Sequence, residues 1–531
     1  MMSSNENVRR SLEVGIKRFF LPLAVTALIC MILLGIGSQK SGFHVDEIYT
    51  FGLSNHPYSE SDSIRISLAD GVPYNGEEIW QDYTGVRESG RFDYANVFEN
   101  QAHDVHPPLY YLLIHTISSM FPKLPVLWVG LLLNIPLACV VFWQMVWIAH
   151  KIGMKKRGAV LFSMFYVLGA GFVDYAVVFF RMYALLSVMV NALVMVFLKF
   201  PAEEKGNFRY YITLGFILLG GMMTQYYFLI YAFFLCVVYL VYLVVFRNWK
   251  KIILSILTAM AAIGTGILIF PASLDQIFGG YRGREAIENA RVGELGSHLW
   301  NYLGQMSRGI FGGFFPAVLF ILLCLVIVYV RKKEYDRNAL RSNLQWWCLM
   351  VLPVCLYVVV IAKIAPYQTL RYVIAVMAPL YLAMFNSMVY LVPSRGKKYV
   401  LLLAAVFLVC GYRQGLENLY LGDRDKISQV EAHSDAQGIY LYKEDWKILS
   451  DYPFLRYMDN IIFWGQDDWQ EKISVDYNCD TMIVYVTNCE ELNQKEVLSQ
   501  MMAGNKMNSC KKIFQSGYTT AYYLQRTGYD G

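Results

Sequence analysis

The chain has 531 residues, of which 56% are hydrophobic and only 16% are charged, and its mean hydropathy is +0.37. These values exclude a soluble globular enzyme and indicate an α-helical polytopic membrane protein. The formal net charge of +5 is small. Basic linkers between the apolar segments explain it, so no nucleic-acid partner is predicted.

The first apolar run extends from Phe19 to Gly37, and four basic residues precede it: Arg9, Arg10, Lys17 and Arg18. The run lacks a small-residue cleavage site, which favours an uncleaved anchor over a signal peptide. Residues 1–18 are therefore predicted to stay in the cytoplasm.

Ten further runs are long enough, or nearly so, to cross a bilayer. They cover about 126–149, 159–173, 182–200, 210–224, 226–246, 252–271, 310–330, 344–364, 372–393 and 398–411. The segment Leu109 to Phe121 is shorter, follows Pro107-Pro108 and contains His115. We therefore expect it to form a helix that lies in the membrane interface.

With 109–121 in the interface, all of the basic linkers fall on one side of the membrane, as the positive-inside rule requires. The sequence thus predicts about eleven transmembrane helices, with the N-terminus in the cytoplasm and the C-terminus outside. The helices form a domain over 19–411. The outer side receives a long first loop (38–125), the turns 174–181 and 365–371, the loop 272–308 and the tail from 412.

An acid pair, Asp46-Glu47, lies about ten residues after the first apolar run. Adjacent carboxylates near the membrane surface are candidates for proton transfer. The alternative interpretation is a solvated loop charge, since ionisable groups are ordinary outside the hydrocarbon.

A second candidate site precedes the interfacial segment, where Asp104 and His106 stand two residues apart just before the double proline. Proline fixes φ and cannot continue a preceding helix, so the pair is predicted in a rigid extended turn. A turn that merely starts a helix would explain the prolines but not the Asp and His.

Cationic side chains open two of the later helices on the outer side. Arg181 and Tyr183 precede one helix, and Arg371-Tyr372 follow Lys363 at another. An arginine in this position either snorkels to the lipid headgroups or turns inward to bind a phosphate, for which the forked guanidinium is well shaped.

Together these motifs resemble the polyprenyl-phosphate-sugar-dependent glycosyltransferases of the GT-C superfamily, a group that includes bacterial protein O-mannosyltransferases and lipid A aminoarabinose transferases. The resemblance covers roughly residues 15–410. It rests on Asp46-Glu47, the string Asp-Val-His-Pro-Pro-Leu-Tyr-Tyr at 104–111, Arg181-Met-Tyr183, Thr-Gln-Tyr-Tyr at 224–227, and Arg371-Tyr372. The chain departs from the family at Phe179, where relatives often carry an acidic residue, and at Gln225, where many carry His.

The resemblance implies an enzyme of the cell membrane that moves a sugar from a polyprenyl phosphate to an extracytoplasmic acceptor hydroxyl. The acceptor class, whether protein, lipid or cell-wall glycan, stays open, as does the sugar. Asp46 is the candidate general base, and Glu47 is the candidate residue that supports it or orients the acceptor. The candidate substrate-binding residues are Asp104, His106, Arg181, Tyr183, Tyr226, Lys363, Arg371 and Tyr372.

No cofactor is required by this chemistry, because a lipid phosphate can leave with arginine help alone. A divalent metal held by Asp46, Glu47, Asp104 and His106 is an alternative, although no single element shows metal-ligand spacing. The Asp-x-Asp string at 423–425 is predicted to be a surface turn. The charged loop 272–308 is either a mobile cover over the site or a solvated loop with internal ion pairs.

After about residue 412 the apolar runs shorten to strand length, at 438–442, 481–486 and 519–524. An amphipathic stretch, 490–502, separates the last two. Residues 412–531 are therefore predicted to form a small extracytoplasmic α/β domain. Its three cysteines, Cys479, Cys489 and Cys510, allow at most one disulfide.

The main rival interpretation is a polytopic transporter or lipid flippase for glycolipid or cell-envelope precursors. Transporters place their binding residues near the bilayer midplane, often in related halves. The charges here gather at one face instead. A non-catalytic glycolipid receptor would keep the arginines but would not need Asp46.

Overall fold

The computed structural model describes residues 22–58, 68–202, 204, 206–292, 294–331, 337–465, 472–473, 475–488 and 493–526, with the side chains of 337–343 excepted. The predicted cytoplasmic segment 1–18 and Cys489 lie outside these residues. The chain folds into two compact units. Unit 1 comprises residues 1–39, 105–110 and 130–417, and unit 2 comprises 40–104, 111–129 and 418–531.

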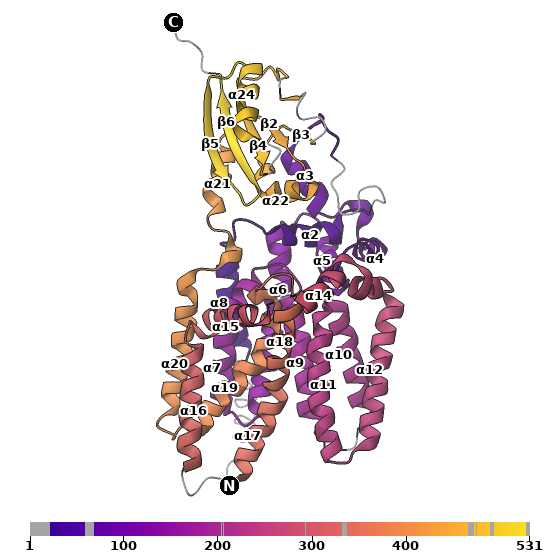
Figure 1. The fold of residues 1–531 in the computed structure, drawn as a ribbon, viewed down its shortest axis with the longest axis vertical. Coiled ribbons are helices and arrows are strands. Elements are labelled where there is room, and N and C mark those ends of the chain that lie inside the picture. Colours follow the sequence, from indigo (N-terminus) through magenta and orange to yellow (C-terminus); the bar gives the residue numbers. More distant parts are fainter. Residues whose placement is uncertain are drawn as a thin grey trace, which may run out of the picture. The chain divides into compact units, whose positions relative to one another are not determined.

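Unit 1 is built almost entirely of helices (Figure 1). They are a first helix Pro22–Gly37, α6 (Val126–Lys151), α7 (Lys156–Val167), α8 (Ala170–Phe172), the π-helical turn η2 (Val173–Val177), α9 (Tyr183–Lys199), α10 (Phe208–Thr224), α11 (Tyr227–Val245), α12 (Trp249–Ile269), α13 (Ala272–Leu274), the π-helical turn η3 (Asp275–Gly279), α14 (Tyr281–Val292), α15 (Leu295–Phe311), α16 (Phe315–Arg331), α17 (Arg337–Met350), α18 (Leu352–Ile364), the 3-10 turns η4 (Leu370–Tyr372) and η5 (Ile374–Val376), α19 (Met377–Leu391), α20 (Lys397–Gly411) and the 3-10 turn η6 (Tyr412–Gln414).

Each of the ten apolar runs from residue 126 onward falls within helical structure. Among the described residues, five helices are long and apolar enough to cross a membrane, or up to eight if each of three bent pairs is one span. Two shorter apolar helices, Pro22–Gly37 and Tyr183–Lys199, add to these. The chain is thus a multi-pass membrane protein, and the total of about eleven spans stays a prediction.

The helices of unit 1 differ in how much of their surface faces neighbouring helices. In the most apolar window of each helix, 83% of residues are buried for the span that contains α19, but only 17% for α12. A helix that is apolar all round and yet exposed has hydrocarbon as its natural solvent. We therefore infer that α12 faces lipid and that α19 forms part of the core.

Unit 2 holds a six-stranded mixed sheet in the order β1-β3-β2-β4-β6-β5. The central strands β3, β2 and β4 are parallel, while β1, β6 and β5 are antiparallel to their neighbours. The elements that belong wholly or largely to unit 2 are α2 (Val45–Asn55), β1 (Pro73–Tyr74), α3 (Gly76–Thr84), the 3-10 turn η1 (Glu88–Gly90), α4 (Tyr94–Ala102), α5 (Leu109–Met120), the 3-10 turn η7 (Glu417–Leu419), α21 (Asp423–Glu431), β2 (Gln437–Leu441), α22 (Asp445–Leu455), β3 (Ile461–Trp464), β4 (Thr481–Thr487), α24 (Gln494–Gly504), β5 (Ser509–Gln515) and β6 (Thr519–Gln525).

Residues along each strand point alternately to the two faces of the sheet. Helices cover both of these faces. On one face, Ile439, Val484 and Leu524 form a core with Val497 and Met501 of α24. On the other face, the rings of Tyr440 and Tyr485 stack at 5.7 Å, and Tyr440 donates a hydrogen bond to Asp451 of α22. The prediction of a small α/β domain is confirmed.

Three details of the predicted architecture need correction. The loop expected over 272–308 is largely helical, since α14 gains an i,i+3 ion pair between Arg282 and Glu285 (2.7 Å) and α15 is amphipathic. The Asp-x-Asp string at 423–425 is the first turn of α21, where acidic residues favour the helix N-terminus.

The division of the chain also differs from the predicted one. The first loop is not an appendage of the helical domain but joins the tail in unit 2, because β1 pairs with β3 and extends the C-terminal sheet.

Candidate active site

The acid pair lies in the first turn of α2, in unit 2. His44 is the N-cap residue: its Nδ1 accepts a hydrogen bond from the amide of Asp46 (3.0 Å), while Oε2 of Glu47 accepts one from the amide of His44 (2.8 Å). This reciprocal capping satisfies two of the helix's unbonded N–H groups. The sequence folds here as a helix start, which fixes both carboxylates relative to the backbone.

Glu47 is fully buried and forms an ion pair with Lys40, with 3.1 Å between Oε2 and Nζ. The ammonium of Lys40 also donates a hydrogen bond to the carbonyl of Asn418 and lies 5.2 Å and 5.1 Å from the ring centroids of Phe43 and Tyr420. Glu47 thus serves the structure at this position, since it caps α2 and balances a buried cation.

Asp46 has different surroundings, because its side chain is 30% exposed. Its Oδ2 lies 3.6 Å from Nδ1 of His44. That nitrogen also accepts a hydrogen bond from the Asp46 amide. A half-exposed carboxylate on a rigid helix turn can exchange protons with a neighbouring hydroxyl.

Asp104 follows α4, and its amide donates to the carbonyl of Gln101 (3.1 Å). The negative charge of the Asp104 carboxylate acts on Tyr83 of α3. Burial, followed by the charges of Tyr49 and Asp104, raises the pKa of Tyr83 well above its ordinary value. The phenol of Tyr83 is therefore neutral.

His106 and Arg181 are in contact within unit 1, with 3.1 Å between His106 Nε2 and an Arg181 guanidinium nitrogen. An arginine can only donate, so Nε2 of His106 accepts and the ring proton sits on Nδ1. Arg181 is 5% exposed and precedes α9. The contact orients the imidazole so that its Nδ1–H can donate to another group.

Arg371, in the turn η4, reaches the same neighbourhood through Phe179. Its guanidinium carbon lies 5.8 Å from the Phe179 ring and 5.1 Å from the Tyr372 ring. Phe179 stacks on Tyr183, with 6.1 Å between the ring centroids. Tyr183 is two residues after Arg181 in the chain. Aromatic faces hold a guanidinium in place without neutralising its charge.

Tyr226 and Lys363 lie at the ends of neighbouring spans. Tyr226, at the N-cap of α11, donates a hydrogen bond to Oε1 of Gln276 in η3 (2.5 Å). Tyr372 touches Tyr227 edge-on at 5.6 Å, so the start of α11 adjoins Arg371. Lys363 is half-buried in the last turn of α18.

The structure thus groups most of the predicted site residues into two sets. His106, Arg181, Tyr183, Arg371 and Tyr372 form one cluster around Phe179, which we call the arginine cluster. Asp46 and Glu47 share one helix turn in unit 2. No sequence pattern identified Lys40 and His44 as their partners, since both precede α2 and follow no helical spacing.

Among the described residues, no three side chains of His, Cys, Asp or Glu gather closely enough to hold a metal ion. The proposed ligands Asp46, Glu47, Asp104 and His106 are not brought together as such a group.

No family model and no curated protein sequence matches the chain. Solved structures do match it. The aminoarabinose transferase ArnT from Cupriavidus metallidurans, bound to undecaprenyl phosphate, shares 12% identity with a TM-score of 0.52 over 96% of this chain and 98% of that chain. Its apo form gives a TM-score of 0.50 at the same identity and coverage.

The chain has the GT-C fold. This confirms the fold class expected from the sequence. The oligosaccharyltransferase of Archaeoglobus fulgidus, in complex with Zn and sulfate, shares 10% identity at a TM-score of 0.43 over 94% of this chain and 72% of that chain, a level from which we infer nothing.

Proposed function

We propose that the protein is a membrane glycosyltransferase that moves a sugar from a polyprenyl phosphate to an acceptor hydroxyl. The observation that carries the proposal is the arginine cluster, in which Arg181 contacts His106 and Arg371 lies over the ring of Phe179, in a chain with the fold of ArnT. That relative was solved with undecaprenyl phosphate bound.

The reaction makes two demands on the site, because one bond forms as another breaks. The acceptor oxygen bonds to the anomeric carbon, its proton passes to a base, and the bond from that carbon to the phosphate oxygen breaks. A single displacement inverts the anomeric configuration. The electron pair of the broken bond stays on the lipid phosphate, whose negative charge grows in the transition state.

Arg181 and Arg371 are the proposed stabilisers of that growing charge. Fixed cations in a partly buried setting lower the barrier without reorganising during the reaction. The Nδ1–H of His106 is proposed to donate to the phosphate or to the sugar. Tyr183, Tyr226, Lys363 and Tyr372 are proposed to line the donor site, and Asp104 the sugar side.

Asp46 is the proposed general base, and its exposure supports this role because a base must reach its proton. Glu47 is better regarded as a positioning residue, since its carboxylate is already engaged with Lys40 and the His44 amide. In this assignment Glu47 holds the turn that presents Asp46.

We also propose that the site faces away from the cytoplasm, with the N-terminus inside and the tail outside. The basic linkers support this orientation. The donor then enters from the outer leaflet, and the acceptor is an extracytoplasmic protein, lipid or cell-wall glycan. No metal is needed for the step as written.

The deciding experiment compares wild type with Asp46→Asn in nanodiscs that contain radiolabelled polyprenyl-phosphate sugars. Loss of a general base lowers kcat by about 10²–10⁴-fold, and donor binding should survive. Glu78→Gln is the matched control, because Glu78 is an exposed carboxylate in the first turn of α3 of the same unit, and it should retain full activity. If no donor binds or turns over while labelled lipid crosses the bilayer, the protein is a transporter instead.

A further inference from the structure

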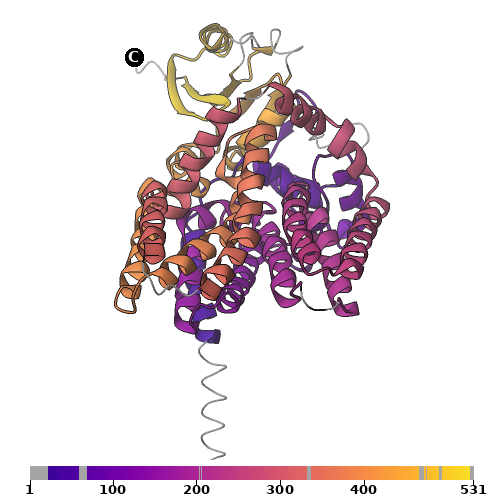
Figure 2. The same cartoon turned by 60° about the horizontal axis from the view of Figure 1, so that its bottom comes forward.

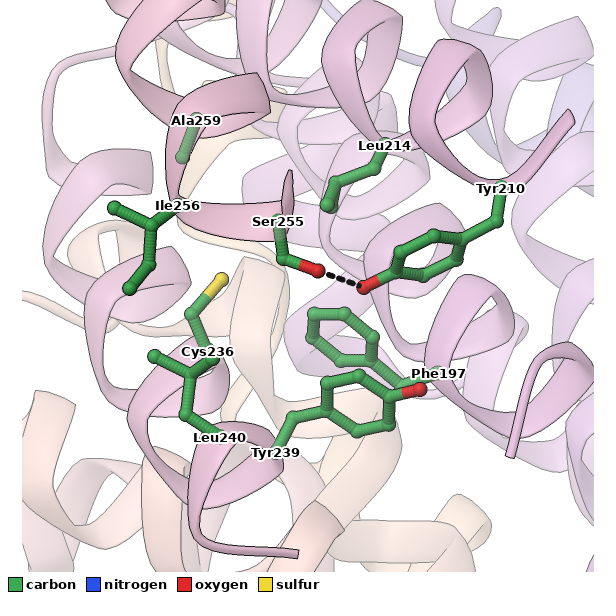
Figure 3. Close-up of a pocket in the computed structure, with 9 residues that line it drawn as sticks. All are labelled: Phe197, Tyr210, Leu214, Cys236, Tyr239, Leu240, Ser255, Ile256 and Ala259. Atoms are coloured by element: carbon green, nitrogen blue, oxygen red, sulfur yellow. Dashed lines mark hydrogen bonds between the residues drawn. The ribbon is translucent and has the colours of Figure 1, made fainter. Parts of the chain in front are cut away.

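A separate cavity of about 60 Å³ lies among α9, α10, α11 and α12 (Figure 3). It is at the far end of α9 from Arg181, since Phe197 borders it and α9 begins at Tyr183. Its lining residues are Phe197, Tyr210, Leu214, Cys236, Tyr239, Leu240, Ser255, Ile256 and Ala259. It therefore lies apart from the arginine cluster.

The polar groups of the lining are bonded to each other or to the backbone. The hydroxyls of Tyr210 and Ser255 are 2.9 Å apart, and the hydroxyl of Tyr239 donates to the carbonyl of Phe200. What the cavity offers an occupant is mainly hydrocarbon and ring surface. A short stretch of a hydrocarbon chain fits such a space, whereas a water molecule needs two to four polar partners.

The lining of the cavity is partly exposed on the side formed by α11 and α12. The helix α12 packs closely on α10 and more sparsely on α11, although α11 and α12 are joined by a short turn (Figures 1 and 2). Ile256 at the mouth is 43% exposed, and Leu240 and Ala259 are partly exposed. A chain in the surrounding bilayer can enter there without unfolding the helices.

The turn that joins α11 and α12 carries the matching charge. Arg247 and Lys250 are exposed, and Trp249 between them is 58% exposed, as is typical of an aromatic side chain at a membrane interface. Lys251, by contrast, is buried and donates to the carbonyls of Phe200 and Pro201. Exposed cations at the ends of apolar helices, beside an interfacial aromatic side chain, are suited to meet lipid headgroups.

The depth of the cavity agrees with this arrangement. Leu240 precedes Arg247 by seven residues, which is about 10 Å along a helix at about 1.5 Å per residue. The hydrocarbon of one leaflet is about 15 Å thick. A lipid whose phosphate meets the turn therefore places the upper to middle part of an acyl chain beside the cavity.

We propose that the gap between α11 and α12 binds one anionic phospholipid, with its phosphate at Arg247 and Lys250 and part of one acyl chain in the cavity. The two exposed cations select an anionic headgroup over a zwitterionic one, because each is worth about 1 kcal/mol near such a surface. The apolar cavity adds contacts to the acyl chain, so that a single lipid is bound at a defined position.

The test is native mass spectrometry of the full chain released from nanodiscs of phosphatidylglycerol or phosphatidylcholine. We expect wild type to retain one phosphatidylglycerol, with at least 10-fold weaker retention in Arg247→Gln/Lys250→Gln and in Ala259→Phe, which fills the cavity and keeps the charges. Arg395→Gln/Lys398→Gln is the charge control, since Arg395 is exposed in the linker before α20 and Lys398 is exposed in the first turn of that helix. Ile263→Phe, one turn along α12, is the volume control. Both should behave as wild type.

Equal retention of phosphatidylcholine, or equal loss in the control variants, would overturn the proposal. Wild type alone gives a second measurement, should Ala259→Phe fail to fold. A photoreactive phosphatidylglycerol with its diazirine in the half of the acyl chain near the glycerol should label Leu240, Ile256 or Ala259. The same lipid with the diazirine at the chain terminus should not, and labelling spread evenly over α16 and α12 contradicts a defined seat.

Discussion

At the residue scale, adjacent side chains in this chain have unequal environments. Asp46 and Glu47 differ by one position, yet the first is partly exposed and the second is sealed against Lys40. The reason is the helix start: a residue at the third helical position turns back to its cap, whereas the residue before it points outward. A substitution at either position therefore tests a different property.

Lys40→Met should destabilise unit 2 by about 3–5 kcal/mol, because it leaves the carboxylate of Glu47 buried without its partner. The free energy of unfolding in denaturant measures this. Arg87→Met is the matched control: Arg87 and Asp82 are 2.6 Å apart but both 49% exposed, and an exposed pair contributes about 1 kcal/mol at most. Similar costs for the two variants would contradict a buried ion pair.

Asp451 predicts a pH dependence of stability in unit 2. Burial raises its pKa from 3.8 to about 6, although the hydrogen bond that Tyr440 donates opposes the rise. The folded state thus binds the proton more tightly than the unfolded chain. The contribution of Asp451 to stability is therefore largest below pH 3.8 and is lost as the pH rises through 6, by about 3 kcal/mol.

Unfolding of wild type and Asp451→Asn between pH 4 and 7 measures the effect. The amide cannot titrate, so the difference between the two proteins should change by about 2 kcal/mol across that range. Parallel pH profiles would show that Asp451 keeps an ordinary pKa.

At the scale of elements, apolar runs predicted helices well and strands less well. Every long run is mostly helical, because in lipid a helix satisfies all of its own backbone groups, although 159–173 and 310–330 are each divided between two helices. The strands β2, β4 and β6 were predicted from short apolar runs. The sequence did not predict β1, with two residues, β3, with four, or β5, an edge strand whose Ser509 to Lys512 are exposed. The charged segment 272–308 was misread because its helices are polar.

Close helix contact supports the arginine cluster at one position. A Cβ on Gly171 of α8 would lie 2.7 Å from the carbonyl of Gly309 of α15, and one on Gly309 would collide with the side chain of Leu370, next to Arg371. Gly171→Ala should cost about 1–3 kcal/mol through overpacking and weaken donor binding. Gly264→Ala, with no atom within 4 Å, is the control and should be neutral or stabilising by up to about 1 kcal/mol. Unchanged donor affinity in Gly171→Ala would contradict this support.

At the scale of the whole molecule, composition and charge predicted the membrane class but not how the chain divides. Unit 2 takes three separate segments, and one short strand, β1, commits the first loop to the C-terminal sheet. The pairing of Tyr74 with Ile461 cannot be predicted from a single sequence, because no sequence pattern marks two residues so far apart as strand partners. The same applies to the arginine cluster, whose members were each predicted but whose contacts through Phe179 were not.

The proposed orientation can be tested with an impermeant maleimide on intact cells that express the chain. Cys510 is exposed in β5 and should be labelled from outside. Gly396→Cys, in the linker before α20, should be labelled only after the membrane is permeabilised. Labelling of Gly396→Cys in intact cells would invert the topology and move the acid pair to the cytoplasm.

The hydrogen bond from Lys40 to the Asn418 carbonyl joins residues 378 positions apart, and this separation bears on the order of synthesis. A ribosome adds about 5–20 residues per second, so Asn418 emerges about 20–75 s after Lys40. The amide of Ser41 likewise donates a hydrogen bond to the carbonyl of Leu419, which is synthesised equally late. The turn that carries Asp46 therefore gains its full support only after the last membrane helix, α20, has been made, and a nascent chain cannot hold the acid pair in its final form.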